Sequence, residues 1–129
     1  MLTMLVRLEF LLMTLGKVDV YYVLDKYGRL VHRSFVFPKC FKFPFLKSNQ
    51  FCIGGPSYTV NEYRGMGIYP KVIDYIVHDK GDANTIFYMF ANEENRSSLK
   101  GITKAEFTAC GRIYQNKMKQ FKRFEYTNQ

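Results

Sequence analysis

The sequence predicts one domain of the α/β (α+β) class that spans residues 1–129. Three observations predict this class. The length of 129 residues suits a single domain. The composition is 47% hydrophobic and 17% aromatic, which is enough for an apolar core and argues against disorder. Runs rich in β-branched and aromatic residues alternate with segments of helical periodicity, in the order helix, β, β, β, helix, β, helix, β, β.

The N-terminal segment, residues 1–15, is very apolar. Leu5, Leu8, Leu12 and Leu15 recur at helical spacing, so we expect a helix that packs on a sheet. Charged residues lie within the segment, and it is shorter than the ~20 residues that a membrane-spanning helix needs. It also lacks a basic leader and a small-residue cleavage site, so we expect neither membrane insertion nor a signal peptide.

The rest of the chain contains strand and helix signals separated by turn residues. A β-hairpin is predicted around the turn at Gly28, because runs of β-branched and aromatic residues flank it. Gly54, Gly55 and Pro56 interrupt a later strand, which predicts a bulge or a bend there. The expected strands are 18–24, 30–37, 51–60 and 85–91, the expected helices are 69–78 and 96–105, and a final hairpin is expected over 107–114 and 120–126.

The chain is basic, with 19 Lys and Arg against 11 Asp and Glu and a net charge of +8. A basic surface attracts phosphates, nucleic acid or anionic lipid, but lysines on a solvated edge strand would explain the same excess. Cys40, Cys52 and Cys110 match no zinc spacing, and an odd count makes a poor disulfide framework. We therefore expect reduced thiols, a cytoplasmic location and no metal site.

The segment from Tyr63 to Pro70 reads Tyr-Arg-Gly-Met-Gly-Ile-Tyr-Pro and lies between a predicted strand and a predicted helix. Backbone N–H groups at the start of a helix bind anions, and glycines allow positive φ and close approach of a ligand. A chance loop could have the same residues. The segment is neither a Walker loop nor a good dinucleotide fingerprint. In this context it predicts a turn that holds a phosphorylated ligand.

This turn resembles the pyrophosphate-binding turn of the GNAT superfamily of N-acetyltransferases, Arg/Gln-x-x-Gly-x-Gly/Ala. Arg64 and Gly67 match it, whereas Tyr69 replaces the last small residue. A second family motif follows, in which Asn95, Ser98, Lys104 and Phe107 fall in place and Glu106 replaces the usual glycine. The resemblance covers residues 18–126. His32-Arg33-Ser34 and Ile53-Gly54-Gly55-Pro56 also look like a bacterial branch associated with polysaccharide biosynthesis.

The resemblance implies a fold, an activity and a set of contact residues. The fold would be a mixed, mostly antiparallel central sheet flanked by helices, splayed between its fourth and fifth strands, with a shortened N-terminal helical region. The activity would be transfer of an acetyl group from acetyl-CoA to a primary amine, with an amino sugar as the expected acceptor. The residues expected to contact acetyl-CoA are Thr59, Val60, Arg64, Gly65, Met66, Gly67, Ile68, Tyr69, Asn95 and Ser98.

Two side chains are candidates for proton transfer in such a reaction. His32 is the candidate base, because an unperturbed histidine titrates near neutral pH, although a strand histidine satisfied by hydrogen bonds would look the same. Tyr58 is the candidate acid, with a core or rim aromatic as the alternative. Many relatives carry a tyrosine on the last helix for this step, and the equivalent position here is Ile102.

Two other functions stay open at this point. A fold relative that binds acetyl-CoA without catalysis would explain Tyr69, Glu106 and Ile102. A basic nucleic-acid-binding module would explain lysines beside phenylalanines, but the RNA-binding signature motifs are missing, so we do not expect nucleic acid as the partner. The expected partners are the small-molecule amine and a second copy of the chain.

Overall fold

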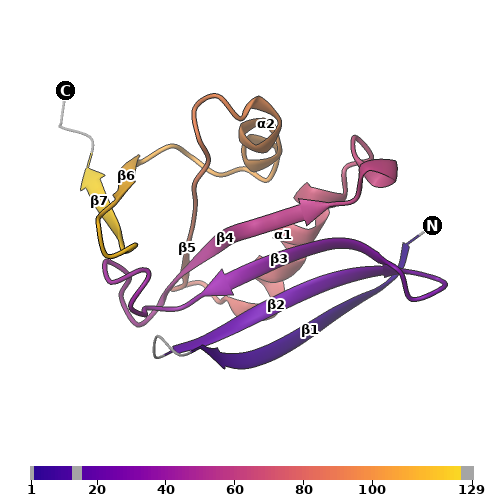
Figure 1. The fold of residues 1–129 in the computed structure, drawn as a ribbon, viewed down its shortest axis with the longest axis horizontal. Coiled ribbons are helices and arrows are strands. Elements are labelled where there is room, and N and C mark those ends of the chain that lie inside the picture. Colours follow the sequence, from indigo (N-terminus) through magenta and orange to yellow (C-terminus); the bar gives the residue numbers. More distant parts are fainter. Residues whose placement is uncertain (1, 13–15, 126–129) are drawn as a thin grey trace.

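The computed structural model describes residues 2–12 and 16–125 and has the α+β class that the sequence predicts. A mostly antiparallel five-stranded sheet runs in the order β1-β2-β3-β4-β5, and β6 and β7 form a separate two-stranded sheet (Figure 1). The elements are β1 (Leu2–Leu12), β2 (Gly16–Asp25), β3 (Leu30–Phe37), β4 (Gln50–Thr59), the short 3-10 helix η1 (Asn61–Tyr63), α1 (Ile68–Lys80), β5 (Ile86–Met89), α2 (Arg96–Lys104), β6 (Gly111–Gln115) and β7 (Phe121–Glu125).

The predicted N-terminal helix is wrong, because residues 2–12 form the edge strand β1. This strand pairs antiparallel with β2, with Leu5 opposite Val23 and Leu8 opposite Val20. A nearly continuous apolar run satisfies both helical and strand periodicity, so the adjacent strand decides the outcome. Leu12 ends the strand, and Leu15 lies outside the described residues. The shortened helical region that the resemblance implies is therefore absent from residues 2–12.

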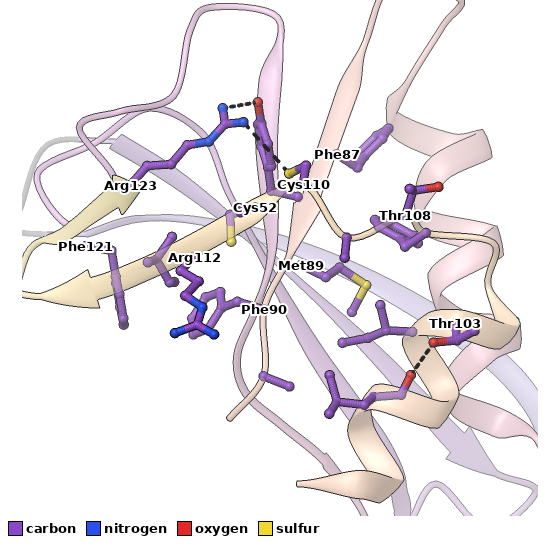
Figure 2. Close-up of a pocket in the computed structure, with 18 of the residues that line it drawn as sticks. Cys52, Phe87, Met89, Phe90, Thr103, Thr108, Cys110, Arg112, Phe121 and Arg123 are labelled. Atoms are coloured by element: carbon purple, nitrogen blue, oxygen red, sulfur yellow. Dashed lines mark hydrogen bonds between the residues drawn. The ribbon is translucent and has the colours of Figure 1, made fainter. Parts of the chain in front are cut away.

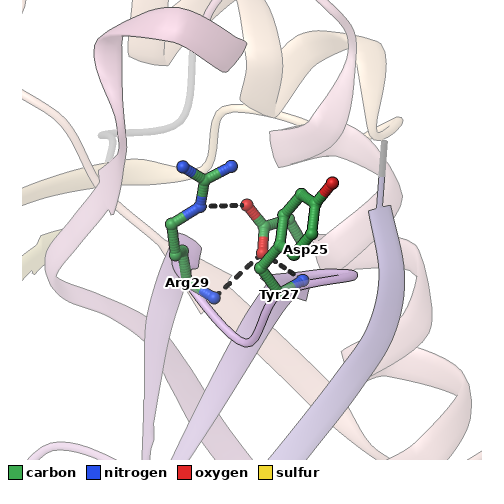
Figure 3. A network of polar contacts seen from close by, with 3 residues as sticks. All are labelled: Asp25, Tyr27 and Arg29. Carbon is green, nitrogen blue, oxygen red and sulfur yellow. Dashed lines mark hydrogen bonds and ion pairs between the residues drawn. The ribbon is translucent and has the colours of Figure 1, made fainter.

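The predicted hairpin between β2 and β3 is confirmed, and its turn is held by the carboxylate of Asp25 (Figure 3). The backbone N–H groups of Tyr27 and Arg29 donate to Asp25 Oδ1 at 2.8 and 2.9 Å, and Arg29 Nε donates to Oδ2 at 2.8 Å. Burial alone would raise the pKa of Asp25, but these hydrogen bonds outweigh it and hold the pKa below its usual value. Gly28 adopts φ 79° in the same turn.

β5 is the only parallel neighbour in the described five-stranded sheet, and its pairing with β4 is short. The two strands pair from Gln50↔Ile86 to Ile53↔Met89, whereas β4 continues to Thr59. Figure 1 shows the two strands diverging beyond this point, and α2 lies above β4 in this view. The predicted irregularity at Gly54–Pro56 is confirmed, since the register of β3 and β4 shifts between Arg33↔Tyr58 and Phe35↔Gly54.

The core has two clusters on opposite faces of the sheet, because neighbouring residues of a strand point to opposite sides. Ile53 lies in the cluster that α1 covers, and Cys52 lies in the other. The predicted apolar face of α1 is confirmed: Ile68, Val72, Ile73 and Ile76 are all buried. The loop between β3 and β4, residues 38–49, contains Phe41, Phe43 and Phe45 and is called the aromatic loop. It covers the second face, where Phe37, Cys40, Phe43 and Leu46 are buried.

The final hairpin is confirmed, although it stands apart from the main sheet (Figure 1). Phe121 attaches it: its N–H donates to Lys42 O at 2.8 Å, and its ring stacks on Phe43 with centroids 5.1 Å apart. The predicted end of this hairpin, Tyr126, lies outside the described residues.

Candidate functional site

The turn between β4 and α1 has the backbone geometry that its glycines predict. Gly65 adopts φ 78° and Gly67 adopts φ 75°, a backbone region that residues other than glycine rarely adopt. Gly67 is the N-cap of α1, and within the described part of the chain no side chain caps the helix there. Because Pro70 has no N–H, the donors at the helix start are those of Gly67, Ile68 and Tyr69.

The surroundings of this turn favour an anion. The first turn of α1 contains no acidic residue, and a helix N-terminus is itself partially positive. A Cβ built at Gly65 or at Gly67 would meet no described atom within 4 Å. Met66, between the two glycines, is exposed with 55% of its surface accessible. The turn therefore presents open backbone donors to solvent, a geometry that accommodates a phosphate group.

The side chain of Arg64 packs back against the end of β4. Its Nε–H donates to the carbonyl oxygen of Thr59 at 2.9 Å, and its guanidinium lies 5.6 Å from the centre of the Tyr58 ring. The guanidinium of Arg33 lies 5.7 Å from the same ring. Tyr58, which is 41% exposed, is thus flanked by two cations. The Arg64 side chain therefore contacts the end of β4 at Thr59 and the ring of Tyr58. Its positive charge lies close to the turn, of which Arg64 is the first residue.

The N–H groups of Thr59 and Val60 point in different directions. The Val60 N–H donates to Val31 O at 2.8 Å, so it belongs to the contact with β3. Successive N–H groups alternate along an extended strand, so the Thr59 N–H points to the opposite edge, where the pairing with β5 has already ended. The Thr59 N–H therefore faces the edge that β5 leaves, whereas the N–H of Val60, which the resemblance also implies as a contact of acetyl-CoA, is engaged with β3.

His32 is buried in the sheet beneath α1, with only 1% of its surface exposed. Its Nδ1 lies 2.6 Å from Thr59 Oγ1, and its Nε2 lies 2.7 Å from Ser34 Oγ. Burial lowers the pKa of His32 to about 4, so the imidazole is neutral near neutral pH. These contacts match the alternative of a satisfied strand histidine, and they disfavour an open, solvent-facing base.

The hydrogen bonds of His32 extend further than the sequence indicated. Ser57 Oγ donates to Ser34 Oγ at 3.2 Å. Burial is the largest cause that raises the pKa of Tyr69 above its usual value. The Tyr69 ring centre is 5.6 Å from that of His32. A sequence signal existed: Ser57 and Thr59 are two residues apart, as are His32 and Ser34, so each pair shares a strand face.

The second motif forms the start of α2. Asn95 is the N-cap, and its Oδ1 accepts hydrogen bonds from the Ser98 N–H at 3.2 Å and the Ser97 hydroxyl at 3.3 Å. Asn95 and the Ser98 N–H therefore serve the helix cap. Gly101 of α2 lies against Tyr69, since a Cβ there would be 2.8 Å from the Tyr69 ring. This contact brings α2 beside the beginning of α1.

A cavity of about 1130 Å³ lies beside β5, between α2 and the β6–β7 hairpin (Figure 2). Met89, Phe90 and Ile102 contribute apolar lining. Arg123 donates to the Tyr88 hydroxyl at 2.8 Å and lies 3.8 Å from Cys110 Sγ. The residues of the turn, Arg64 to Tyr69, do not line it. This cavity and the turn from Arg64 to Tyr69 are therefore two separate features.

Comparison with known proteins does not assign the chain to a family: no protein-family model, curated protein or solved structure matches it. None of the helices that the structure describes combines the length and the apolar character needed to cross a bilayer. Across residues 2–12 and 16–125, no group of three or more His, Cys, Asp and Glu side chains is arranged to hold a metal ion.

Proposed function

We propose that the protein is an N-acyltransferase that moves an acetyl group from acetyl-CoA to a primary amine, with an amino sugar as the first acceptor to test. The observation that carries this proposal is the continuous unit from β4 to α1. In this unit a strand leaves its parallel neighbour after Ile53, and a turn with two positive-φ glycines then opens a helix. The proposal places the protein in the GNAT superfamily, whose sheet the described five-stranded sheet resembles in its mostly antiparallel order.

The turn has the donors that a pyrophosphate requires. The N–H groups of Gly67, Ile68 and Tyr69 would bind phosphate oxygens, aided by the helix dipole and by the open space at Gly65. The unpaired edge of β4 would hold the extended arm of the donor by backbone hydrogen bonds. Asn95 and Ser98 would act by capping α2, which packs against Tyr69.

The chemistry requires a carbonyl to be held and protons to be moved. The donor, when bound, supplies a thioester carbon that an amine can attack. The Thr59 N–H, directed away from β3, would stabilise negative charge on the thioester oxygen. The exposed ring of Tyr58, flanked by Arg33 and Arg64, lies on the opposite face of β4 from Thr59 and would line the approach of the amine.

Calorimetric titration with acetyl-CoA tests this function. Gly67→Glu would place a negative side chain among the donors, and we expect it to weaken binding at least about tenfold, or 1.4 kcal/mol. Gly28→Glu is a matched control, because Gly28 has φ 79°, also has no described atom within 4 Å of a built Cβ, and lies in the β2–β3 turn. A folded wild type that does not bind acetyl-CoA would refute the proposal, as would equal losses in the two variants.

The nucleic-acid alternative finds less support in the aromatic loop. Lys42 Nζ lies 5.1 Å from the Phe37 ring centre and 5.8 Å from that of Phe121. Phe43 is fully buried and stacks on Phe121. These rings pack on each other, so they do not form an open stacking platform for bases. An acyl-CoA-binding protein without turnover remains the alternative outcome of the experiment.

A further inference from the structure

We propose that the cavity beside β5 binds the acyl chain of the donor, so that the protein takes acyl chains longer than an acetyl group. This inference rests on the proposed acyl transfer and names the class of donor, a fatty acyl thioester of coenzyme A. The phosphates of the donor would lie at the turn from Arg64 to Tyr69, and its chain would end in the cavity. The reaction is unchanged: the carbon–nitrogen bond forms, the carbon–sulfur bond breaks, and one proton passes from the amine nitrogen to the thiol sulfur.

The cavity begins where β4 and β5 separate. Ile53 and Met89 form the last pair between the two strands, and Met89 lines the cavity. Phe90, the next residue, also lines it, and a Cβ built at Gly54 would lie 3.6 Å from the Phe90 ring. Figure 2 shows the side chains of Met89 and Phe90 on this wall. The point at which the paired part of the sheet ends is therefore also one wall of the cavity.

Helix α2 contacts both the turn and the cavity. Gly101 packs against the ring of Tyr69, since a Cβ built there would lie 2.8 Å from that ring. Leu99, Ile102 and Thr103 of the same helix line the cavity. An α-helix with its side chains is only about 10–12 Å wide. One extended ligand can therefore have its phosphates at the turn and its chain in the cavity.

The part of β4 that β5 leaves gives the chain a path to the cavity. The proposed donor to the thioester oxygen is the N–H of Thr59, and the pairing with β5 ends at Ile53. Six residues at about 3.3 Å each separate these positions by at most about 20 Å. An acetyl group ends one bond beyond the thioester carbon, so it does not reach the cavity. A fatty acyl chain spans this path and ends in the cavity.

The apolar lining of the cavity fits such a chain. Phe87 and Met89 of β5, Ile102 of α2 and Ile113 of β6 belong to this lining, so apolar side chains enter from three elements. The volume of about 1130 Å³ is large even for a small-molecule site, which typically has roughly 300–1,000 Å³. The space is therefore far larger than an acetyl group requires.

The charged residues of the cavity do not select an ionic ligand. Among the described lining residues they are Glu93, Glu106, Arg112 and Arg123, two of each sign. Arg112 lies 3.3 Å from Glu93, and Arg123 donates to the Tyr88 hydroxyl. Because the formal charges cancel, burial of apolar surface is the main force that a ligand can gain here. An uncharged aliphatic chain meets this condition.

A first test compares donors of different chain length on the wild-type protein. Calorimetry would give the Kd of acetyl-CoA and of palmitoyl-CoA, the latter kept below the concentration at which it forms micelles. Each buried methylene contributes about 0.8 kcal/mol, or about fourfold in affinity. We expect palmitoyl-CoA to bind at least about 100-fold more tightly, which requires the burial of only about three or four methylene groups. Equal affinities for the two donors would overturn the acyl-chain site and leave the proposed acetyl transfer intact.

A second test fills the cavity. Ile102→Trp should weaken binding of palmitoyl-CoA at least about tenfold and leave the Kd of acetyl-CoA within about threefold, which also shows that the variant is folded. If this variant does not fold, Leu99→Trp gives the same test at a residue that is 38% exposed. Met118→Trp is the control, because Met118 is 63% exposed and lies outside the cavity lining.

The results separate this inference from the proposed function. A preference for palmitoyl-CoA that the folded Trp variants at Ile102 and Leu99 retain would overturn the inference, because the chain would then bind elsewhere. The same holds if Met118→Trp weakens palmitoyl-CoA as much as they do. A folded wild type that binds neither donor would refute the acyl transfer and the acyl-chain site together.

Discussion

The buried histidine should make the protein sensitive to mild acid in a way that can be calculated. The pKa of His32 is about 4 in the folded protein and 6.5 in its ordinary state. The unfolded chain therefore binds more protons between these values, so stability is lost as the pH falls from 6.5 towards 4. At about 1.4 kcal/mol for each tenfold change in protonation, about 2 kcal/mol is lost between pH 7 and pH 5, out of about 3 kcal/mol in total.

Urea unfolding at a series of pH values would measure this effect, with His32→Gln as the reference. The reference titrates like the wild type except at position 32, so the difference between the two unfolding free energies isolates the histidine. We expect this difference to favour the wild type most at neutral pH and to shrink by about 2 kcal/mol by pH 5. If the difference in unfolding free energy between wild type and His32→Gln stays constant over this range, His32 has the same pKa in the folded and unfolded protein. The effect of burial on its pKa would then be wrong.

Three further changes probe the packing around the site. Gly101→Ala should destabilise the protein by about 1–3 kcal/mol, because its Cβ would lie 2.8 Å from the Tyr69 ring. In a double-mutant cycle measured by urea unfolding, Tyr69→Ala should relieve this cost. Asp19→Ala should cost about 3 kcal/mol in the same assay, because it leaves Lys80, which is only 18% exposed, without this carboxylate. An equal loss in Arg112→Ala, which breaks a pair with Glu93 that is exposed on both sides, would contradict this reasoning. Phe121→Ala should release the β6–β7 hairpin, so hydrogen exchange should speed up in β6 and β7 but not in β2 and β3; equal protection in both sheets would show that Phe121 is not the attachment.

The features that the sequence predicted well depend on local chemistry. Gly65 and Gly67 lie at positive φ because the turn between a strand and a helix requires it, and Gly28 does the same in the hairpin. The face of α1 followed from the spacing of Ile68, Val72, Ile73 and Ile76. Each of these signals lies within a few residues of the structure that it predicts.

The features that the sequence missed depend on contacts between distant segments. The strand at residues 2–12 exists because β2 lies beside it, and the apolar leucines alone did not distinguish it from a helix. The contact between His32 and Thr59 depends on the register of β3 and β4, which the irregularity near Gly54 changes. Between two successive pairs, β3 advances by two residues, from Arg33 to Phe35, while β4 moves by four, from Tyr58 to Gly54, so the register shifts by two residues. Such a shift decides which side chains meet, and composition does not encode it.

The single parallel pair in the described sheet also has a consequence for the order of folding. β1, β2 and β3 are consecutive antiparallel neighbours, whereas the contact between Ile53 and Met89 joins residues separated in the sequence by the whole of α1. Contacts between residues so far apart in sequence have a larger loop-closure cost, so the meander can nucleate first and the β4–α1–β5 unit can join late. A ligand held by the α1 turn would then stabilise contacts made after the transition state. Such a ligand should slow unfolding while it leaves the refolding rate nearly unchanged.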